Sequence, residues 1–134
     1  MNKLVRGFTL IEMMIVVAII ALIIAFGYPS YRNQVMKTNR SDGMIFLLEI
    51  ADRQERFYSD QGSYTTDITD LDFADTTSPD GHFTVAITDD PSGDITITYQ
   101  ITATAQGTQA KDTCDTFTVD SLGTRSSSPA GCWD

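Results

Sequence analysis

One long run of apolar residues dominates the first third of the chain. From Phe8 to Tyr28 there are twenty-one residues, and Glu12 is the only charged side chain among them. At 1.5 Å of rise per residue, a helix of this length crosses a hydrocarbon core of about 30 Å. Residues 13–26 contain no polar side chain at all. The pattern predicts a membrane-spanning helix over residues 8–29 that carries one costly carboxylate.

Beyond Pro29 the apolar residues follow the spacing of a helix with one buried face. This pattern predicts an amphipathic helix over about residues 30–59, which continues the first helix without an intervening loop. Because proline removes a backbone donor and clashes with the preceding turn, we expect a kink at Pro29. The predicted packing face consists of Met44, Leu47, Leu48, Ala51 and Tyr58.

In the second half of the chain the period shortens to two, which is typical of half-buried strands. Phe83, Val85 and Ile87 alternate along HFTVAIT, and the segment DITITYQITATA alternates in the same way. The sequence DDPSG between them favours a turn, so the two strands should form a hairpin. On one side of the second strand we expect Ile95, Ile97, Tyr99 and Ile101.

A third strand is predicted over residues 116–119, and the tail from Ser121 is expected to be a loop. Three or four antiparallel strands cannot bury a core by themselves. The helix over residues 30–59 is the available partner, which indicates an α+β fold with a long N-terminal helix packed on a three- or four-stranded antiparallel sheet.

The 134 residues carry a net charge of −9, and the charges are unevenly distributed. Lys3 and Arg6 precede the apolar run, whereas the part beyond Gln61 contains twelve Asp and only Lys111 and Arg125 as basic residues. Phosphate binding depends on clustered lysine and arginine, so this balance argues against nucleic acid as a partner.

The basic residues at the N-terminus also predict the orientation in the membrane. Lys3 and Arg6 should stay in the cytoplasm while the part beyond Tyr31 is exported. A cleaved signal peptide remains an alternative, but it needs a small-x-small site after its apolar core. That place is occupied by FGYPSYRNQ, which contains no such site.

Two cysteines, Cys114 and Cys132, enclose seventeen residues near the C-terminus. Outside the cytoplasm a disulfide between them is expected, and closing such a loop contributes roughly 3 kcal/mol in the chain-entropy model. In the cytosol the same cysteines would more often be free, and their spacing is too wide for a CxxC pair.

Other candidate chemistry is weak, and we predict no catalytic residue, metal or cofactor. An acidic segment could suggest calcium, but its spacing lacks the pattern of an EF-hand, so a solvated loop is favoured. His82 has no second base or nucleophile beside it and is expected at the start of a strand, and Trp133 is expected to pack locally beside the disulfide. The acidic segment contains Asp67, Asp70, Asp72 and Asp75.

The N-terminal segment RGFTLIE, followed by fourteen apolar residues, resembles the prepilin signature of type IV pilins and of the pseudopilins of type II secretion. The signature places a glycine, an aromatic residue, an acid and a long apolar run in one register. The resemblance implies that a prepilin peptidase cuts between Gly7 and Phe8, removes the leader 1–7, and methylates the new amino group of Phe8.

The same resemblance implies a role for Glu12 in subunit assembly. A carboxylate within hydrocarbon costs at least about 2.5 to 3.5 kcal/mol and normally finds a polar partner. Cleavage creates such a partner, because a free α-amino group is largely protonated at neutral pH. In this family the glutamate is thought to pair with the N-terminal amine of an adjacent subunit. The alternative is that Glu12 reaches to the cytoplasmic interface of the membrane.

The resemblance extends over the whole chain, which looks like a type IVa pilin. Residues 30–65 are similar to the PilE-like minor pilins, which share an NR-x-(D/E)-G step followed by A-x-RQER-(F/Y)-Y. It implies a minor pilin that primes or joins a type IV pilus and supports assembly, twitching motility and adhesion. Alternatives are a type II secretion pseudopilin, a major pilin or a DNA-binding competence pilin.

The implied partners are other pilin subunits, the prepilin peptidase and an inner-membrane assembly platform. Before assembly, residues 8–29 would lie in the inner membrane and the globular domain, residues 30–134, in the periplasm. After assembly the subunit would be part of an extracellular pilus. The sequence does not indicate which surface or receptor is touched.

Overall fold

The computed structural model describes residues 7–91 and 93–133. Residues 1–6, which include Lys3, Arg6 and most of the predicted leader, lie outside the described residues. The elements, in chain order, are α1 (Leu10–Gln61), the short 3-10 helix η1 (Ile68–Leu71), β1 (Phe83–Thr88), β2 (Gln100–Ala105), the 3-10 helix η2 (Gln109–Lys111), β3 (Thr116–Asp120) and β4 (Arg125–Ser128).

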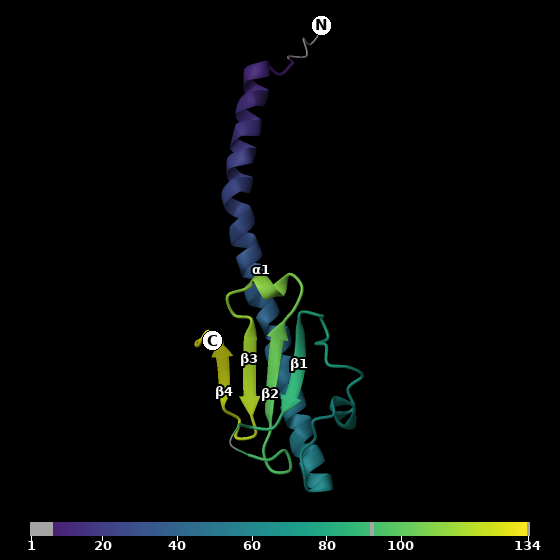
Figure 1. Cartoon of the computed structure of the whole chain (residues 1–134). Helices are drawn as coiled ribbons and strands as arrows, with labels where there is room; N and C mark the ends of the chain where they lie inside the picture. Colours follow the sequence, from purple (N-terminus) through teal and green to yellow (C-terminus); the bar gives the residue numbers. More distant parts are fainter. Residues whose placement is uncertain (1–6, 92, 134) are drawn as a thin grey trace. The chain divides into compact units, whose positions relative to one another are not determined.

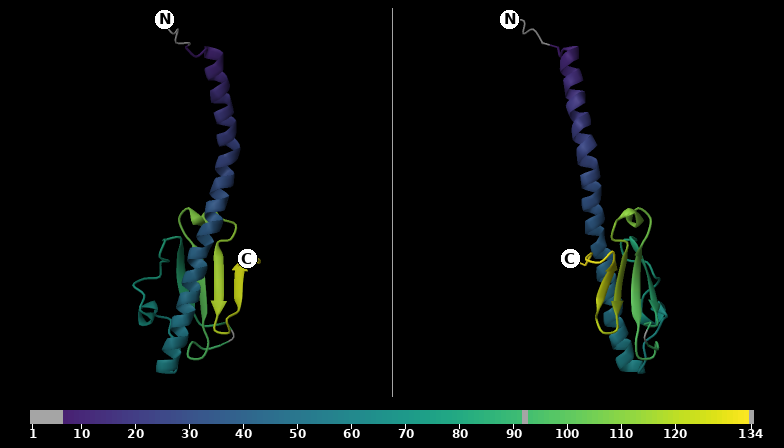
Figure 2. Two further views of the ribbon diagram at one scale, coloured as in Figure 1. Left: turned by 180° about the vertical axis from the view of Figure 1, so that it is seen from behind. Right: turned by 60° about the vertical axis from the view of Figure 1, so that its left-hand side comes forward.

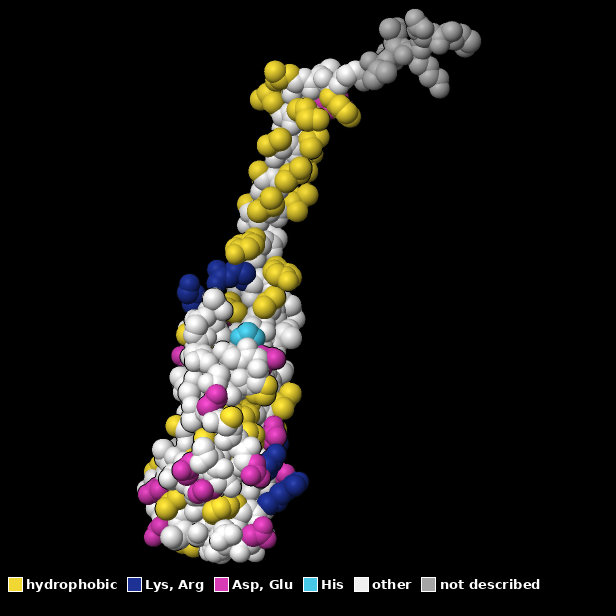
Figure 3. Space-filling view, turned by 90° about the vertical axis from the view of Figure 1, so that its right-hand side faces the viewer, with side chains coloured by type: hydrophobic (Ala, Val, Ile, Leu, Met, Phe, Trp, Pro, Cys, Tyr) yellow, Lys and Arg dark blue, Asp and Glu magenta, His cyan; other side chains and the backbone are white. Residues whose placement is uncertain are grey.

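The chain divides into two compact units, the first ending at Val35 and the second beginning at Met36. In the first unit every described residue from Gly7 to Val35 is exposed. An 18-residue window of α1 near the N-terminus has a mean hydropathy of 2.8 and no buried residue, so it is long and apolar enough to cross a membrane. In Figure 3 hydrophobic side chains crowd the visible face of this segment.

The helix α1 is continuous through Pro29. The division predicted between residues 29 and 30 therefore falls within a single helix, and the kink at Pro29 stays a prediction.

In the second unit the strands form an antiparallel sheet in the order β1-β2-β3-β4, in which each strand pairs with the next along the chain. The helix covers one face of this sheet, as the views in Figures 1 and 2 show. The predicted α+β fold is confirmed. Between the two layers lies a core of Phe46, Leu47, Ile50, Ile68, Leu71, Phe83, Val85, Ile87, Tyr99, Ile101, Ala103, Ala105, Phe117 and Val119, with Cys114 and Cys132 at its edge.

The buried face of α1 differs in part from the predicted one. Leu47 is fully buried, but Leu48 and Tyr58 are each 37% exposed. Gln54 is fully buried although it is polar. The helical face that meets the sheet therefore differs from the face predicted from the apolar residues alone. Its buried residues are Gly43, Phe46, Leu47, Ile50 and Gln54.

The second predicted strand begins later than its alternating pattern indicated. Ile97 is 63% exposed, and β2 starts only at Gln100. The reason is Asp94, whose carboxylate accepts a hydrogen bond from the Thr96 amide at 2.9 Å while its carbonyl accepts from the Ile97 amide at 2.9 Å. These local bonds compete with a sheet ladder and produce a turn instead.

The C-terminal tail, predicted as a loop, contains the fourth strand. β4 pairs with β3 from Val119↔Arg125 to Thr116↔Ser128. Its sequence, RSSS, has no apolar alternation, and three of its four residues are exposed. Backbone pairing alone defines this edge strand, so a hydrophobic pattern could not reveal it.

Candidate assembly surfaces

The first turn of α1 holds Glu12 in a capped helix terminus. The Thr9 hydroxyl oxygen accepts a hydrogen bond from the Glu12 amide at 3.3 Å, and the Thr9 carbonyl accepts from the Met13 amide at 3.2 Å. Thr9-x-x-Glu12 matches the capping-box pattern, and an acid in the first turn interacts favourably with the helix dipole. Thr9 was not among the predicted site residues, although its spacing to Glu12 is the sequence pattern of a capping box.

Gly7 and Phe8 precede the first helical residue and both are exposed, Phe8 by 75%. The bond between them therefore lies in non-helical backbone directly before the cap. Glu12 is exposed as well, one turn further along the helix. The structure places these three residues within six positions of one another at the end of an uncovered apolar helix.

In the second unit, Asp42 and Gly43 dock α1 against the segment that leads into β1. The Asp42 carboxylate accepts hydrogen bonds from the Ser78 hydroxyl at 2.5 Å and from the His82 amide at 3.3 Å. A Cβ on Gly43 would lie 2.7 Å from Cγ of the fully buried Phe83, so this position requires glycine. The Asp-Gly step thus fixes the start of the sheet on the helix, and His82 stands at the strand entry, as predicted.

A nearly buried ion pair joins α1 to the connection between β2 and β3. Arg40 donates to both carboxylate oxygens of Asp112, at 2.7 and 2.8 Å, and the two side chains are 16% and 5% exposed. The Arg40 hydrogen bond holds the pKa of Asp112 below its ordinary value, and the pKa of Arg40 is raised. Gln109, also buried, donates to the Met36 carbonyl at 2.9 Å and to Asp112 at 3.0 Å.

At the other end of the helix, polar side chains fasten the segment that follows α1. The Gln54 amide donates to the Thr65 carbonyl at 2.6 Å and accepts from the Thr65 amide at 3.2 Å. Glu55 accepts from the hydroxyls of Tyr64 at 3.1 Å and Tyr99 at 3.3 Å. Burial, reinforced by Glu55, raises the pKa of Tyr64 to about 12 and also raises that of Tyr99.

The acidic segment serves as a set of turn caps. Asp67 accepts from the amide and the hydroxyl of Thr69 at 2.9 and 2.6 Å, and these bonds lower the pKa of its carboxyl group. Asp70 accepts from the Thr65 hydroxyl at 2.8 Å. Among the described residues no group of three or more His, Cys, Asp or Glu is placed to hold a metal ion.

The C-terminal segment is closed on the sheet by a disulfide between Cys114 and Cys132, whose Cα atoms are 5.9 Å apart. The Trp133 ring packs edge-on against Phe117 with 5.6 Å between centroids, and its indole nitrogen donates to the Ser126 carbonyl. The Arg125 guanidinium lies 5.5 Å from the Trp133 ring centroid. Trp133 therefore packs locally beside the disulfide, as predicted.

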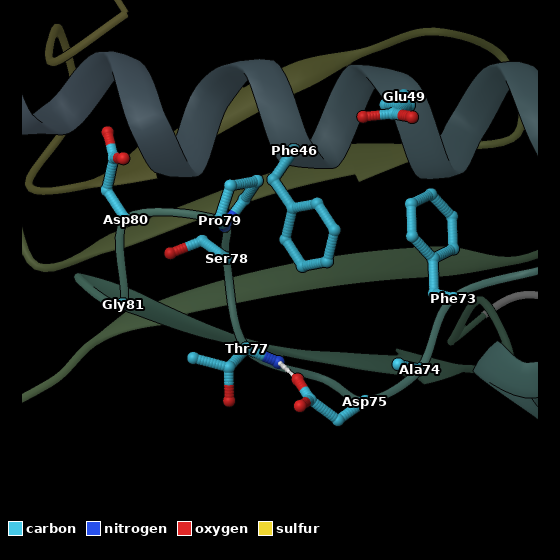
Figure 4. Close-up of a pocket in the computed structure, with 10 residues that line it drawn as sticks. All are labelled: Phe46, Glu49, Phe73, Ala74, Asp75, Thr77, Ser78, Pro79, Asp80 and Gly81. Atoms are coloured by element: carbon cyan, nitrogen blue, oxygen red, sulfur yellow. Dashed lines mark hydrogen bonds between the residues drawn. The ribbon is translucent and has the colours of Figure 1, made fainter.

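A cleft lies between α1 and the segment after η1, and Figure 4 shows its lining. It has a volume of about 600 Å³. The rings of Phe46, from the helix, and Phe73, from the facing segment, meet edge-on with 5.3 Å between centroids. Acidic side chains lie along its rim, namely Glu49, Asp75 and Asp80.

A long helix with an uncovered apolar segment, packed on a four-stranded antiparallel sheet with a disulfide-closed C-terminus, defines the class of type IV pilins. The chain belongs to the family described as type IV minor pilin ComP, DNA uptake sequence receptor, whose sequence profile matches residues 29–118. A second profile, the prokaryotic N-terminal methylation motif, matches residues 2–28. The chain is a structural subunit of a type IV pilus, and its apolar helix fits membrane anchoring followed by incorporation into the fibre.

Two relatives illustrate the similarity. The chain is 31% identical over 109 residues to the fimbrial protein EcpC of Eikenella corrodens, which covers 79% of this chain and 70% of EcpC. It is 30% identical over 83 residues to the type IV major pilin protein PilE of Neisseria gonorrhoeae, which covers 62% of this chain and 50% of PilE. The chain thus spans only about half the length of the gonococcal pilin.

Two solved structures share the fold. A type IV pilin from Shewanella oneidensis aligns with a TM-score of 0.55 at 24% identity, over 74% of this chain and 98% of that pilin. The non-core minor pilin PilV of Neisseria meningitidis aligns with a TM-score of 0.55 at 22% identity, over 71% of this chain and 88% of PilV. At these identities the alignments support the fold alone.

Proposed function

We propose that the chain is a minor pilin that is processed between Gly7 and Phe8, methylated on Phe8, and drawn from the inner membrane into a pilus through Glu12. The observation that carries this proposal is a single carboxylate, Glu12, at the capped start of the apolar part of α1, in which every described residue up to Val35 is exposed. Such a helix needs cover, which lipid supplies before assembly and the helices of neighbouring subunits supply in a filament.

The prepilin peptidase acts on the Gly7–Phe8 bond in this scheme, and the new amine becomes a cation at neutral pH. The amine of one subunit and Glu12 of the next then neutralise each other within the apolar filament core. Because an unpaired charge there is costly, the pair selects one register between the two helices. Before assembly residues 30–134 lie in the periplasm, and the assembly platform lifts the helix out of the membrane.

The test of this function is the composition of sheared pili and the mass of the N-terminal peptide. We expect the chain in the pilus fraction at a small fraction of the major subunit, beginning at Phe8 with one added methyl group. Deleting the gene in a strain without a redundant copy should reduce piliation and twitching. A chain that begins at Met1, or that is confined to the membrane of a piliated strain, would contradict the proposal.

A second candidate function is DNA capture, which the description of the matching family supports. The charges of this chain argue against it. In the second unit Arg40, Arg53 and Arg56 are each engaged by a carboxylate. Lys37 and Lys111 are exposed and have no ion pair in the described part of the chain, but they stand in a protein with eighteen acidic residues. DNA binding needs clustered bases to neutralise phosphates.

We therefore expect the full chain, purified in detergent micelles, to bind a short DNA duplex no more tightly than about 1 μM even at low salt. A gel-shift titration with the wild type and with the Lys37→Glu, Lys111→Glu double variant measures this. Nanomolar binding that the double variant loses would instead establish DNA capture and place it at these two lysines.

A further inference from the structure

β1 forms one edge of the sheet, and the chain itself covers only the first part of its outer side. The segment that leads into β1 runs antiparallel beside it. The Phe83 carbonyl accepts a hydrogen bond from the Ser78 amide at 2.9 Å, and the Val85 amide donates to the Thr76 carbonyl at 2.8 Å. This pairing ends at Thr76, so the rest of the β1 edge lies beyond it.

The outer backbone groups of β1 beyond this contact are unpaired. In an antiparallel ladder, the N–H and C=O groups of successive residues point alternately to the two sides of a strand. Because the Val85 amide points away from β2, the Val85 carbonyl and both backbone groups of Ile87 do so as well. Within residues 7–91 and 93–133, none of these three groups has a hydrogen-bond partner.

The side chains of β1 also leave this edge open to pairing. Edge strands are often protected by charged residues or proline, which discourage the addition of another strand. The sequence of β1, FTVAIT, contains neither. The unpaired part of β1 is therefore able to accept a further strand.

A cleft of about 510 Å³ lies beside this part of the edge. One of its walls is β1, and the other is formed by residues at the start of η1. In Figure 1 the segment that carries η1 stands beyond the edge of the sheet, next to β1. The cleft thus occupies the side of β1 on which an added strand would run. Its lining includes Val85, Ala86 and Ile87 of β1, together with Asp67, Ile68 and Thr76.

The surroundings of the cleft are acidic. Asp67 lines it, Asp89 directly follows the last residue of β1, and both side chains are exposed. In the described part of the chain, neither carboxylate forms an ion pair with a lysine or an arginine. Figure 3 views the molecule from this side, and Asp and Glu side chains are scattered over the lower half of the visible face. An occupant of the cleft therefore meets negative charge that is not neutralised.

We propose that the outer edge of β1 binds a basic peptide in an extended conformation, which joins the sheet as an additional antiparallel strand. The peptide backbone pairs with the Val85 carbonyl and with both backbone groups of Ile87. Every second side chain of the peptide lies on the same side of the sheet as Ile87 and covers the apolar lining. Its lysines or arginines neutralise Asp67 and Asp89. The site lies in the second unit, and the inference does not depend on the pilin function.

The chemistry of the cleft favours this occupant over others. A helix cannot pair with the edge, because its own backbone groups are bonded within the helix. Nucleic acid and anionic lipid headgroups carry phosphates, which the carboxylates repel. An acidic peptide could make the backbone bonds but would meet the same repulsion. A basic extended peptide satisfies both the unpaired backbone groups and the negative charge.

The experiment is a titration of the full chain, purified in uncharged detergent micelles, with a synthetic peptide in which lysine and valine alternate over seven residues. The first control peptide has glutamate in place of lysine. The second is methylated on the backbone nitrogen of each valine. In an antiparallel pair, the residue opposite Ile87 has its side chain on the same face and its N–H directed at β1, so this methylation blocks pairing and keeps the charge.

We expect the lysine–valine peptide to bind at least about tenfold more tightly than either control, as measured by fluorescence anisotropy. Hydrogen exchange followed by NMR locates the contact. Binding should slow the exchange of the Ile87 amide at least about tenfold more than that of the Ala86 amide, which points to β2. Equal affinities for the three peptides, or equal effects on the two amides, would overturn the proposal.

A double variant of the chain tests the role of charge. Asp67→Asn with Asp89→Asn removes both charges, and the asparagine at position 67 keeps an oxygen that can accept the bonds from Thr69. The affinity for the lysine–valine peptide should fall at least about fivefold. The matched control is Asp60→Asn with Asp115→Asn, which changes two exposed carboxylates outside the cleft and should leave the affinity unchanged. Equal losses in the two double variants would show unspecific attraction and overturn the proposal.

Discussion

Replacing Glu12 by alanine is expected to lower the amount of this chain in sheared pili by at least about tenfold, while cleavage after Gly7 continues. Without the carboxylate, the amine of the neighbouring Phe8 enters the apolar core unpaired, and leaving one partner of a desolvated charge pair alone costs about 2–5 kcal/mol. The measurement is immunoblotting of the pilus and membrane fractions, together with the mass of the N-terminal peptide.

Two further variants separate the charge of Glu12 from its place in the helix cap. Glu12→Gln keeps the size and hydrogen-bonding capacity of the side chain but removes its charge, so it should be as defective as Glu12→Ala. Thr9→Ala removes the hydroxyl that accepts a hydrogen bond from the Glu12 amide, and this loss costs only about 1 kcal/mol of local helix stability. Normal incorporation of the Glu12→Gln variant into pili would contradict the charge pair and support the alternative that Glu12 reaches to the cytoplasmic interface of the membrane.

Replacing Arg40 by methionine is expected to destabilise the second unit by about 3 kcal/mol, because the Asp112 side chain, 5% exposed, would lose both of its guanidinium hydrogen bonds. Arg56→Met is the matched control. Arg56 also contacts a carboxylate, at 2.8 Å from Asp52, but these side chains are 72% and 58% exposed, so its loss should cost under about 0.5 kcal/mol. Thermal unfolding of the full chain in detergent micelles measures both, and equal effects would contradict the prediction.

The Arg40–Asp112 pair also predicts how the stability depends on pH. The pKa of Asp112 is lower in the folded chain than the ordinary value of about 3.9 for an unfolded aspartate. Its ionised form therefore stabilises the fold above about pH 4, and this contribution is lost as the pH falls through the folded-state pKa. The difference in unfolding free energy between wild type and Arg40→Met should shrink below pH 4, whereas an undiminished difference would contradict the ionic explanation.

The helical half of the fold could be predicted because its signals are local. Twenty-one residues without a second charge define the apolar segment, and the spacing of apolar residues continues the helix to within two positions of its observed end at Gln61. The prediction of the helical face that packs on the sheet was less accurate. Gln54 is buried because the Thr65 backbone satisfies its amide, and no apolar pattern reports a polar side chain whose partner is eleven residues away.

In the sheet, too, some features could be predicted from local sequence signals and others could not. β1 alternates along its whole length and was predicted, whereas Ile97 continues the alternation in sequence but lies in a turn held by Asp94. β4 has no apolar pattern and exists because its backbone pairs with β3.

The sequence by itself determined the class of protein and the candidate assembly residues, because Gly7, Phe8 and Glu12 lie within six positions at the start of one apolar run. Periodicity and short motifs are properties of neighbouring residues, so they can be read without coordinates. Only the tertiary structure decided which carboxylates are bound and which are free. Asp112 lies 72 residues from the arginine that neutralises it, and the cleft in Figure 4 brings Phe46 and Glu49 beside residues 73–81. Such contacts depend on the path of the folded chain, which no local pattern encodes.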